Sequence, residues 1–368
     1  MSHSVRHLIR LFLLLACYSA TLAAAQAGKP EPLPPLNIDI RETSVSGLSS
    51  GAFMSVQFQV AYSSIVKGAG IIAGGPYYCS QGGALRATTQ CSCTLDPIHY
   101  LCGVSRSSTD VPELVSHTRE FAAKGLIDDP VNLARQRVFI LAGDKDQTVP
   151  TPIAEQLSDY YLRLAVPAVN ISPVRLSNAA HTMPTVDYGK DCGVSESPYM
   201  GKCGYDAAKE VLSWIYGPLK TPPPGKPAGR FMQFDQKPYL PKNRFSWSTG
   251  IDSSGWAYIP ESCAKGEACR LHVALHGCRQ GQNYLPLWPL QRGELYYGTT
   301  FVRNAGYDRW AESNNIVVLY PQAVSIPGKN PNGCWDWWGY TDENFANNKG
   351  VQLSAIRAMV GQLTSGRR

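Results

Sequence analysis

The first half of the chain alternates between short buried strands and amphipathic helices. Residues 38–46 alternate apolar and polar side chains and are rich in β-branched residues, which is typical of a strand. Further buried strands are predicted at residues 66–75, 137–142 and 174–176, and helices at 52–65, 153–165 and 205–216. The cysteine-rich residues 77–103 show no clear periodicity and are expected to form a loop.

The second half repeats this alternation after a break in composition. Residues 217–229 are rich in proline and glycine, and proline lacks the backbone donor and fixes φ, so they form a linker. Beyond the linker, the pattern predicts strands at residues 256–259, 270–275 and 315–320 and an amphipathic helix at 351–363. Strands that alternate with helices imply an α/β fold, in which helices cover both faces of a mostly parallel sheet.

The composition narrows the class of protein. Of the 368 residues, 44% are hydrophobic and 17% are charged, so the chain can bury a core and is not disordered. The 34 Lys and Arg against 28 Asp and Glu give a formal net charge of +6, without a long basic run. We therefore expect no nucleic-acid partner. Beyond the N-terminus no segment approaches about 20 uncharged apolar residues, so we expect no membrane span.

The N-terminal residues 1–25 have the pattern of a secretory signal peptide. Basic residues precede the apolar run 11–16, and the alanines at 23–25 supply small side chains for cleavage. The apolar run is too short to cross a bilayer of about 30 Å as a helix. We therefore expect a mature chain that is secreted, into the periplasm or the medium, and free of the membrane after cleavage. Cys17 leaves a lipoprotein signal open, although an incidental cysteine is the favoured interpretation.

The cysteines agree with an oxidising compartment. Eleven occur in the chain, and the ten beyond Cys17 are enough for five disulfides. The expected pairs are Cys192–Cys203 and Cys263–Cys269 by close spacing, Cys278–Cys334 as a long-range hypothesis, and two among Cys79, Cys91, Cys93 and Cys102. A zinc site at Cys91 and Cys93 is the alternative, but it lacks a C-x-x-C pair and a well-spaced histidine. We therefore expect no metal.

A candidate nucleophile lies between the first predicted strand and the first predicted helix. The segment Gly47-Leu48-Ser49-Ser50-Gly51 has the form G-x-S-x-G, and its place between strand and helix is the one a nucleophile elbow needs. Glycines allow the sharp turn that holds a serine hydroxyl above the sheet. A plain turn is the alternative, because glycine and serine are common turn residues.

A serine nucleophile needs a base that a carboxylate orients. In this kind of fold the chain order is serine, acid, histidine. Asp146 follows the strand at 137–142, and the spacing G-x-x-D-x-x-V-P favours it over Asp144. His181 follows the next strand among small residues, and it is the best base by elimination and by order. The alternatives are a turn or capping role for the aspartates and a solvated histidine.

The order of the remaining site elements is unusual. An oxyanion hole takes one N–H from the residue after the nucleophile and another from a loop after a second strand. Ser50 supplies the first, and Cys278 in the segment His-Gly-Cys supplies the second, yet Cys278 lies far downstream of Ser49. Moving residues 230–368 ahead of the first half restores the usual order, so we predict a circularly permuted single domain over 26–368. Two separate domains would leave each half with an incomplete site.

Together these segments resemble one family of enzymes. GLSSGAFMSVQF, IIAGGPYYC, GDKDQTVP, AAHTMPT, VALHGC and NPNGCWDWWGY are similar to segments of secreted poly(3-hydroxybutyrate) depolymerases, most closely the single-domain, circularly permuted type within the α/β-hydrolase superfamily. The similarity covers nearly all of residues 38–363. The resemblance implies a nucleophile at Ser49, a base at His181, an orienting acid at Asp146, and oxyanion donors at the Ser50 and Cys278 amides.

The tryptophans indicate how such a substrate would be held. All eight lie at or beyond residue 214, and Trp335, Trp337 and Trp338 fall within one loop. A single tryptophan usually belongs to a core, but three within one short loop are hard to bury together, so we expect an exposed aromatic ledge that adsorbs a polyester. The resemblance also implies that Trp335 lies beside the site and contacts substrate, and we assign Trp338 to substrate binding as well.

The sequence therefore predicts a secreted serine esterase that hydrolyses poly(3-hydroxybutyrate) and its oligomers through an acyl-enzyme. The expected partner is the hydrophobic polyester or oligoester, and we expect a monomer without a cofactor. One alternative is a carbohydrate-side-chain esterase, acting on feruloyl or acetylxylan esters with the same machinery. The other is a non-catalytic polymer-binding protein on a hydrolase scaffold, which a complete triad disfavours.

Overall fold

The computed structural model describes residues 29–96, 98–225, 227–242, 244, 246–284 and 297–367. The predicted signal peptide at residues 1–25, with Cys17, lies outside the described residues. In the described part of the chain, no helix is long and apolar enough to cross a membrane.

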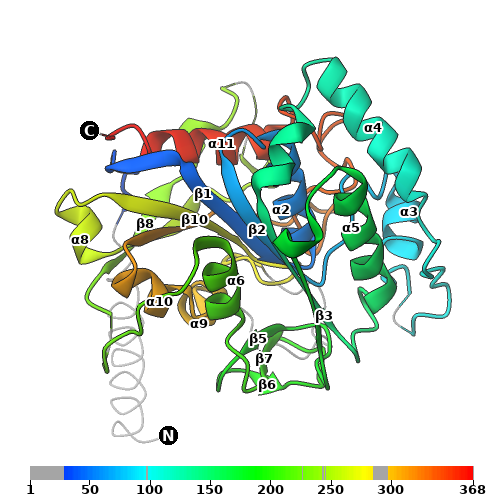
Figure 1. Cartoon of the computed structure of the whole chain (residues 1–368), viewed down its shortest axis with the longest axis horizontal. Coiled ribbons are helices and arrows are strands. Elements are labelled where there is room, and N and C mark those ends of the chain that lie inside the picture. Colours follow the sequence, from blue (N-terminus) through cyan, green and yellow to red (C-terminus); the bar gives the residue numbers. More distant parts are fainter. Residues whose placement is uncertain are drawn as a thin grey trace, which may run out of the picture.

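One sheet of eight strands runs through the molecule (Figure 1). In spatial order the strands are β4 (Ile171–Leu176), β3 (Arg137–Gly143), β2 (Val66–Ile72), β1 (Ile38–Leu48), β10 (Cys269–Leu275), β11 (Ile316–Tyr320), β9 (Ser254–Ile259) and β8 (Arg230–Asp235). The strands from β4 to β11 are parallel to their neighbours, whereas β9 and β8 pair antiparallel. The predicted mostly parallel sheet is confirmed.

Helices cover both faces of this sheet, because its central strands are apolar on both sides. In β3, Val138 and Ile140 join one core cluster, while Phe139 and Leu141 join the other. The first cluster lies under α2, α5 and α11, with α4 outside α5, and the second lies under α6, α9 and α10 (Figure 1). The helices are α2 (Ser50–Ala61), α3 (Ala84–Thr89), α4 (Val111–Ala123), α5 (Thr151–Arg163), α6 (Ala207–Tyr216), α7 (Ser246–Thr249), α8 (Glu261–Ala264), α9 (Thr300–Asn304), α10 (Tyr307–Ser313) and α11 (Val351–Leu363).

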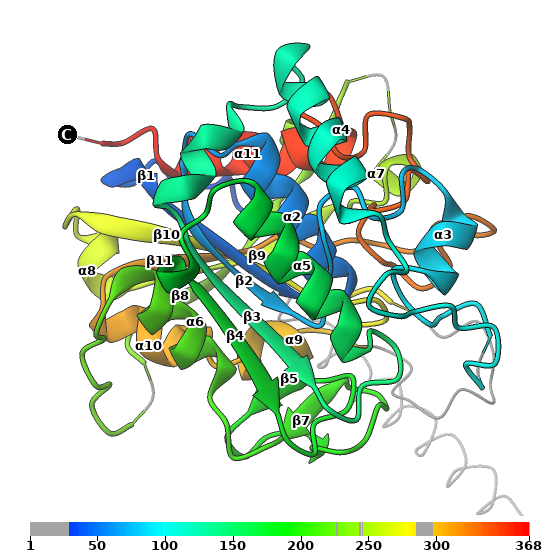
Figure 2. The same ribbon diagram turned by 45° about the vertical axis from the view of Figure 1, so that its right-hand side comes forward.

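Most predicted elements are present, and most of the additional ones are short, with the 13-residue α4 as an exception. A small sheet of β5 (Met183–Thr185), β7 (Met200–Lys202) and β6 (Lys190–Asp191) follows β4 (Figure 2). The sequence analysis assigned no element to α4 or β8, and α3 lies within the segment expected to be a loop. A signal for α4 exists, since Asp110 caps it by accepting a hydrogen bond from the N–H of Glu113, and a proline sits in its first turn.

The strand order supports the predicted circular permutation. Numbered along the chain, β1 lies between β2 of the first half and β10 of the second, so both halves build one sheet. If β8–β11 are counted first, the spatial order from β8 to β4 becomes 1-2-4-3-5-6-7-8, in which a single pair of strands is exchanged. Both halves thus contribute strands to one sheet, and a single permuted domain over residues 26–368 stays a prediction. The described residues of the linker at 217–229 form neither helix nor strand.

Five disulfides close loops around this sheet. They pair Cys79 with Cys91, Cys93 with Cys102, Cys192 with Cys203, Cys263 with Cys269, and Cys278 with Cys334. The three pairs predicted by name are confirmed, and the cysteine-rich segment supplies the other two. Among the disulfides of the described residues, the Cys278–Cys334 bond alone joins distant parts of the chain, with a sequence separation of 56.

A buried polar network crosses the sheet beneath α6 and α10. The two ring nitrogens of His272 lie 2.6 Å from Ser44 Oγ and 2.7 Å from Ser46 Oγ. The same serines reach the hydroxyls of Tyr216 and Tyr307, at 2.8 and 2.6 Å. Complete burial disfavours the charged imidazolium and lowers the pKa of His272 to about 3. His272 is therefore a neutral structural group of the core.

We expect acid to destabilise the fold through this histidine. Because the folded pKa of about 3 lies below the ordinary 6.5, the unfolded chain binds the extra proton first, and stability is lost as the pH falls below 6.5. Replacing His272 with Gln should reduce the slope of the unfolding free energy against pH by about 1.4 kcal/mol per pH unit. Urea unfolding between about pH 7 and pH 5 measures both slopes, and equal slopes would contradict the prediction.

Candidate active site

The predicted site residues gather at one edge of the sheet. Ser49 follows β1, Asp146 follows β3, His181 follows β4, and Cys278 follows β10. Since these strands are parallel, their carboxyl ends lie along the same edge, which is where ligands bind in open α/β sheets.

Ser49 occupies a strained turn between β1 and α2. Its backbone has φ 57° and ψ −122°, a conformation that L-residues rarely adopt. Two glycines make the turn possible by close approach: a Cβ at Gly47 would collide with the backbone of Gly51, and a Cβ at Gly51 would collide with the carbonyl of Leu275. The side chain is partly exposed, whereas the next residue, Ser50, is buried. This geometry is that of a nucleophile elbow.

Asp146 and His181 form a buried hydrogen-bonded pair. His181 Nδ1 lies 2.8 Å from Asp146 Oδ2, and the side chains are 8% and 0% exposed. The other carboxylate oxygen accepts hydrogen bonds from the N–H groups of Thr148 and Val149, each at 2.8 Å. Both oxygens of Asp146 are thus held in place. The side chain of Asp144, by contrast, is exposed. Of the two candidates, Asp146 is therefore the one whose carboxylate pairs with His181.

The loop that carries His181 is fixed on its other side. The backbone N–H of His181 donates to Ser195 Oγ at 2.9 Å, and the N–H of Ala180 donates to the carbonyl of Cys192 at 2.8 Å. The Cys192–Cys203 disulfide closes that neighbouring segment. With Nδ1 directed at the carboxylate, Nε2 is the ring nitrogen that can accept a proton.

The second oxyanion segment packs directly on the elbow. A Cβ at Gly277 would lie 3.4 Å from the Cβ of Ser49, so the loop after β10 touches the turn after β1. Gln280 Oε1 accepts a hydrogen bond from the N–H of Gly277 at 2.7 Å and shapes this loop. Ser50 begins α2, so its N–H has no partner inside the helix, which makes it a donor suited to a developing anion.

Trp335 links the two predicted oxyanion donors. Its Nε1–H donates to the carbonyl of His276 at 3.0 Å, and its backbone N–H donates to Ser50 Oγ at 3.3 Å. The preceding residue, Cys334, is bonded to Cys278. A single short segment therefore connects the start of α2 with the loop after β10, through two hydrogen bonds and a disulfide.

The expected aromatic ledge is wrong. Trp335 is 0% exposed and Trp337 is 7% exposed, and only Trp338 of the three is partly accessible. Trp337 stacks on Phe53 of α2, with 4.0 Å between ring centroids and 11° between ring planes. The prediction failed because this loop packs on α2 and β10, where each buried indole finds a partner. Direct contact of Trp335 with substrate stays a prediction.

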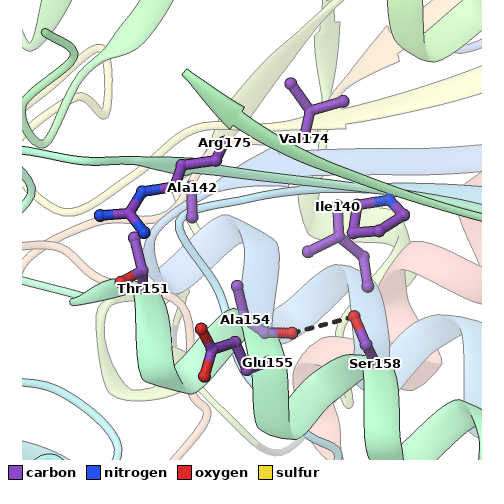
Figure 3. A pocket seen from close by; sticks show the side chains of 9 residues that line it. Ile140, Ala142, Thr151, Ala154, Glu155, Ser158, Val174 and Arg175 are labelled. Carbon is purple, nitrogen blue, oxygen red and sulfur yellow. Dashed lines mark hydrogen bonds between the residues drawn. The ribbon is translucent and has the colours of Figure 1, made fainter. Parts of the chain in front are cut away.

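A pocket is present at residues other than the predicted site residues. Figure 3 shows it between α5 and the strands β3 and β4, with a volume of about 120 Å³. Two of its polar groups have partners: Ser158 Oγ donates to the carbonyl of Ala154, and Glu155 pairs with Arg106 at 2.9 Å. It contains none of the predicted site residues. Within the described residues, no group of three His, Cys, Asp or Glu side chains could hold a metal ion.

Comparisons with known proteins agree with the expected family. No protein-family model matches the sequence. A poly(3-hydroxybutyrate) depolymerase of Delftia acidovorans is 38% identical, and the match covers 96% of this chain and 67% of that protein. A polyhydroxybutyrate depolymerase of Talaromyces funiculosus is 35% identical over 94% of this chain and 96% of its own length.

Two solved structures share the fold. One is a PHB depolymerase from Penicillium funiculosum, with a TM-score of 0.77 and 33% identity, covering 92% of this chain and 100% of that one. The other is a serine-to-alanine variant of a PHB depolymerase in complex with an R3HB trimer, with a TM-score of 0.78, 32% identity and the same coverage. The expected fold class and resemblance are confirmed.

The two neighbouring aspartates allow a matched test of the acid. In Asp146→Asn the amide cannot hold the imidazole in its productive tautomer, so kcat for a soluble chromogenic ester should fall by roughly 10⁴-fold. Asp144→Asn changes an exposed carboxylate two residues away and should leave kcat close to that of the wild type. Equal losses of kcat in the two variants would contradict the prediction that Asp146 is the acid that orients His181.

The hydrogen bonds of Trp335 predict an effect on kcat and not on KM. Trp335→Phe removes the indole N–H that donates to the carbonyl of His276, and this should loosen the loop that carries the predicted oxyanion donor at Cys278. The loss of one hydrogen bond should lower kcat by about two- to tenfold and leave KM unchanged. Trp310→Phe, which removes an indole N–H that donates to Asp206 outside the predicted site residues, serves as the control. A rise in KM with unchanged kcat would instead assign Trp335 to substrate contact.

Proposed function

The chain belongs to the family of poly(3-hydroxybutyrate) depolymerases, and we propose that Ser49, His181 and Asp146 are its catalytic triad. The chain is a carboxylic ester hydrolase that cleaves poly(3-hydroxybutyrate). The observation that carries the proposal is the buried pair of His181 and Asp146 at the sheet edge where Ser49 occupies its strained turn.

The proposed reaction begins with attack by the serine. Ser49 Oγ adds to the ester carbonyl of the polymer while His181 Nε2 takes the hydroxyl proton, and Asp146 stabilises the resulting imidazolium. The oxyanion of the tetrahedral intermediate accepts hydrogen bonds from the N–H groups of Ser50 and Cys278. Their rigid attachment through Trp335 supports this role, because donors fixed in advance need no reorganisation during the reaction.

The tetrahedral intermediate then breaks down and releases one part of the polymer chain. The C–O bond of the ester breaks, and His181 returns its proton to the departing alkoxide, which leaves as a chain with a free 3-hydroxyl group. A 3-hydroxyacyl ester remains on Ser49. Water attacks this ester with His181 as base, the acyl–Ser49 bond breaks, and a carboxylic acid is released while Ser49 regains its proton.

The compartment and domain structure belong to the same proposal. We infer secretion with cleavage of residues 1–25, and five disulfides support an oxidising compartment because cytosolic thiols are kept reduced. The sheet shared by both halves supports one permuted catalytic domain over residues 26–368. The monomeric state and the absence of a cofactor stay predictions.

Ser49→Ala tests the nucleophile and the substrate together. The variant should lose roughly 10⁶-fold in kcat on a soluble 3-hydroxybutyrate trimer, since no other group can form the acyl-enzyme. Released 3-hydroxybutyrate and free carboxylate measure the reaction, and retained binding of the trimer shows that the fold is intact. A variant that still cleaves the trimer would disprove the assignment.

The same enzyme preparation separates the alternatives. Wild type should cleave the trimer with a higher kcat/KM than feruloyl or acetylated xylan esters. The reverse preference would favour a carbohydrate-side-chain esterase. Adsorption to polymer without release of any hydroxy acid would favour a binding protein on a hydrolase scaffold.

A further inference from the structure

A buried glutamine lies between two segments of the candidate active site. Gln280 is 1% exposed and belongs to the loop that follows β10. Its side-chain oxygen accepts a hydrogen bond from the N–H of Gly277 at 2.7 Å, and its backbone N–H donates to the carbonyl of the same residue at 3.3 Å. Cys278, the second predicted oxyanion donor, lies inside the tight turn that these two bonds close. Gln280 therefore shapes the oxyanion loop from within.

The amide nitrogen of the same side chain binds a different segment. Gln280 Nε2 donates to the carbonyls of Pro198 and Tyr199, at 3.1 Å each. A side-chain amide has one acceptor oxygen and two donor hydrogens, so its partners determine which end is the oxygen. Exchanging the two ends would set N–H groups against the N–H of Gly277 and an oxygen against two carbonyls. Both ends of the amide are therefore satisfied in one orientation.

The segment that Gln280 reaches is also the one that fixes His181. The carbonyl of Tyr199 accepts a second hydrogen bond, at 2.8 Å, from the N–H of Met183, two residues beyond the histidine. Ser195, in the same segment, accepts a hydrogen bond from the N–H of His181 at 2.9 Å. Two contacts therefore join this segment to the predicted base, and Gln280 joins it to the oxyanion loop.

This contact crosses between the two halves of the chain. Gln280 follows the linker in sequence, whereas the segment that fixes His181 precedes it. Among the disulfides of the described residues, none joins a cysteine before the linker to one after it. The separation of the base from the oxyanion loop therefore depends on noncovalent contacts. Trp335 joins the two predicted oxyanion donors, and Gln280 adds the link from the oxyanion loop to the base.

The proposed reaction depends on that separation. The base takes the proton of Ser49 Oγ on one side of the ester carbonyl while the oxyanion donors bind the carbonyl oxygen. A displacement of about 1 Å in such an arrangement costs roughly 10²-fold in rate. The amide of Gln280 limits this displacement, because it is buried and both of its ends are hydrogen-bonded.

We propose that Gln280 is a positioning residue that holds the oxyanion loop at a fixed distance from His181. The inference rests on the proposed function, since it concerns the same nucleophile, base and oxyanion donors. Gln280 acts through Gly277 on one side and through the carbonyls of Pro198 and Tyr199 on the other. Its contribution is to the alignment of groups that meet in the transition state, so its loss should change kcat and not the binding of substrate.

The first test removes the hydrogen bonds of Gln280 and keeps its volume. In Gln280→Met, kcat for the soluble trimer should fall by about 10- to 100-fold with KM unchanged, measured below the unfolding midpoint of the variant. A trifluoromethyl ketone analogue of the ester reports the same alignment. Ser49 Oγ bonds to the ketone carbon, its proton passes to His181, and the ketone oxygen becomes the oxyanion. The affinity for this analogue should fall by the same factor as kcat/KM.

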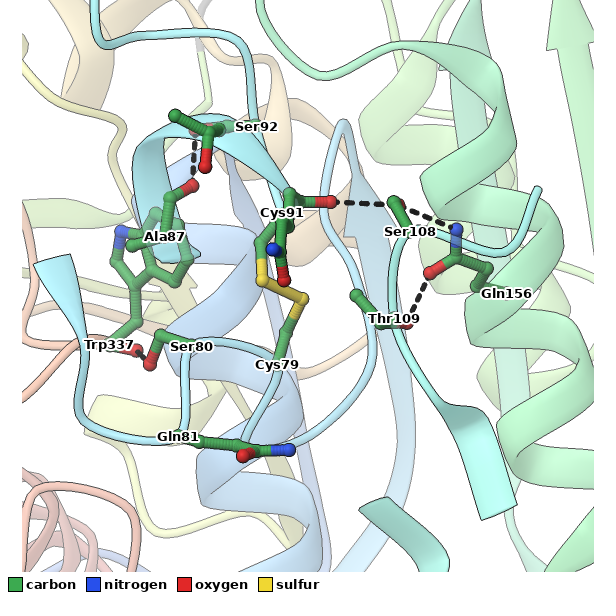
Figure 4. The surroundings of a disulfide bond; sticks show 12 residues. Cys79, Ser80, Gln81, Ala87, Cys91, Ser92, Ser108, Thr109, Gln156 and Trp337 are labelled. Carbon is green, nitrogen blue, oxygen red and sulfur yellow. Dashed lines mark hydrogen bonds between the residues drawn. A yellow bond between two sulfur atoms is a disulfide. The ribbon is translucent and has the colours of Figure 1, made fainter. Parts of the chain in front are cut away.

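A buried glutamine of α5 provides the matched control. Gln156 is 3% exposed, and its amide nitrogen donates to the carbonyl of Ser105 at 2.6 Å and to Ser108 Oγ at 3.0 Å. Its oxygen accepts a hydrogen bond from the hydroxyl of Thr109, and Figure 4 shows the amide between Ser108 and Thr109. Gln156→Met loses the same number of hydrogen bonds as Gln280→Met, so both should unfold at a lower temperature. Gln156→Met should keep the wild-type kcat and affinity for the ketone.

A second variant separates the two ends of the amide. In Gln280→Glu a carboxylate still accepts from the N–H of Gly277, but it donates nothing to the carbonyls of Pro198 and Tyr199, so kcat should fall. Burial beside two carbonyls favours the neutral acid, which donates one hydrogen bond. The kcat of Gln280→Glu relative to wild type should therefore recover as the pH falls, while that of Gln280→Met stays constant. A relative kcat that is independent of pH in both variants would contradict the link to His181.

The remaining outcomes decide between positioning and a purely structural role. A lower unfolding midpoint of Gln280→Met with unchanged kcat and analogue affinity would overturn the proposal, as would equal losses of kcat in Gln156→Met. A rise in KM alone would assign Gln280 to substrate binding instead. If wild type cleaves a chromogenic ester but not the trimer, the proposed function fails, and the same comparison of variants on the chromogenic ester still tests Gln280.

Discussion

The parallel pairing of β1 with β10 is the interaction on which the rest of the molecule depends. Gly47 lies opposite Leu275 in this pair, so the turn with Ser49 and the loop with Cys278 leave the sheet side by side. Closing so long a stretch of chain costs entropy that grows slowly with its length. Strands buried on both faces offset that cost, since every side chain of β10 except that of Arg270 is buried. The site is assembled by this pairing, because its predicted oxyanion donors come from opposite halves of the chain.

The sequence predicted the strands and their ends better than it predicted the surface. Continuous apolar runs mark strands buried on both faces, and the chemistry at their carboxyl ends follows from topology, so Asp146 and His181 could be placed before any coordinates. Helix α11 begins and ends where its apolar periodicity does. The exposure of Trp335 could not be predicted, because it depends on a carbonyl of His276 that is distant in the sequence. Elements β8 and α4 lie outside the prediction, although the helical spacing of Val111, Leu114 and Val115 and the cap at Asp110 do indicate α4.

Buried polar groups, rather than apolar packing alone, fix the loop that carries the tryptophans. The carboxylate of Asp336 is buried, and it accepts hydrogen bonds from the N–H groups of Gly339, Tyr340 and Thr341. Burial raises the pKa of this carboxyl group, so its hydrogen bonds oppose the cost of removing a charge from water. A loop shaped around one carboxylate has few alternative conformations. This explains how Trp335 can hold two segments of the site at fixed separation.

The loop of residues 79–102, which the Cys79–Cys91 and Cys93–Cys102 disulfides close, is stabilised in a different way, because it has little core of its own. Its buried apolar residues are Cys79, Ala87, Cys91 and Cys93, and three of these are disulfide cysteines. A segment that buries so little cannot hold large apolar groups in water by packing, so covalent links must restrict the alternatives. In the neighbouring loop, by contrast, Trp335 and Trp337 are buried, so that loop is held by packing. The two loops are joined where Ser80 Oγ donates a hydrogen bond to the carbonyl of Trp337, so the loop closed by disulfides is anchored to the loop held by packing.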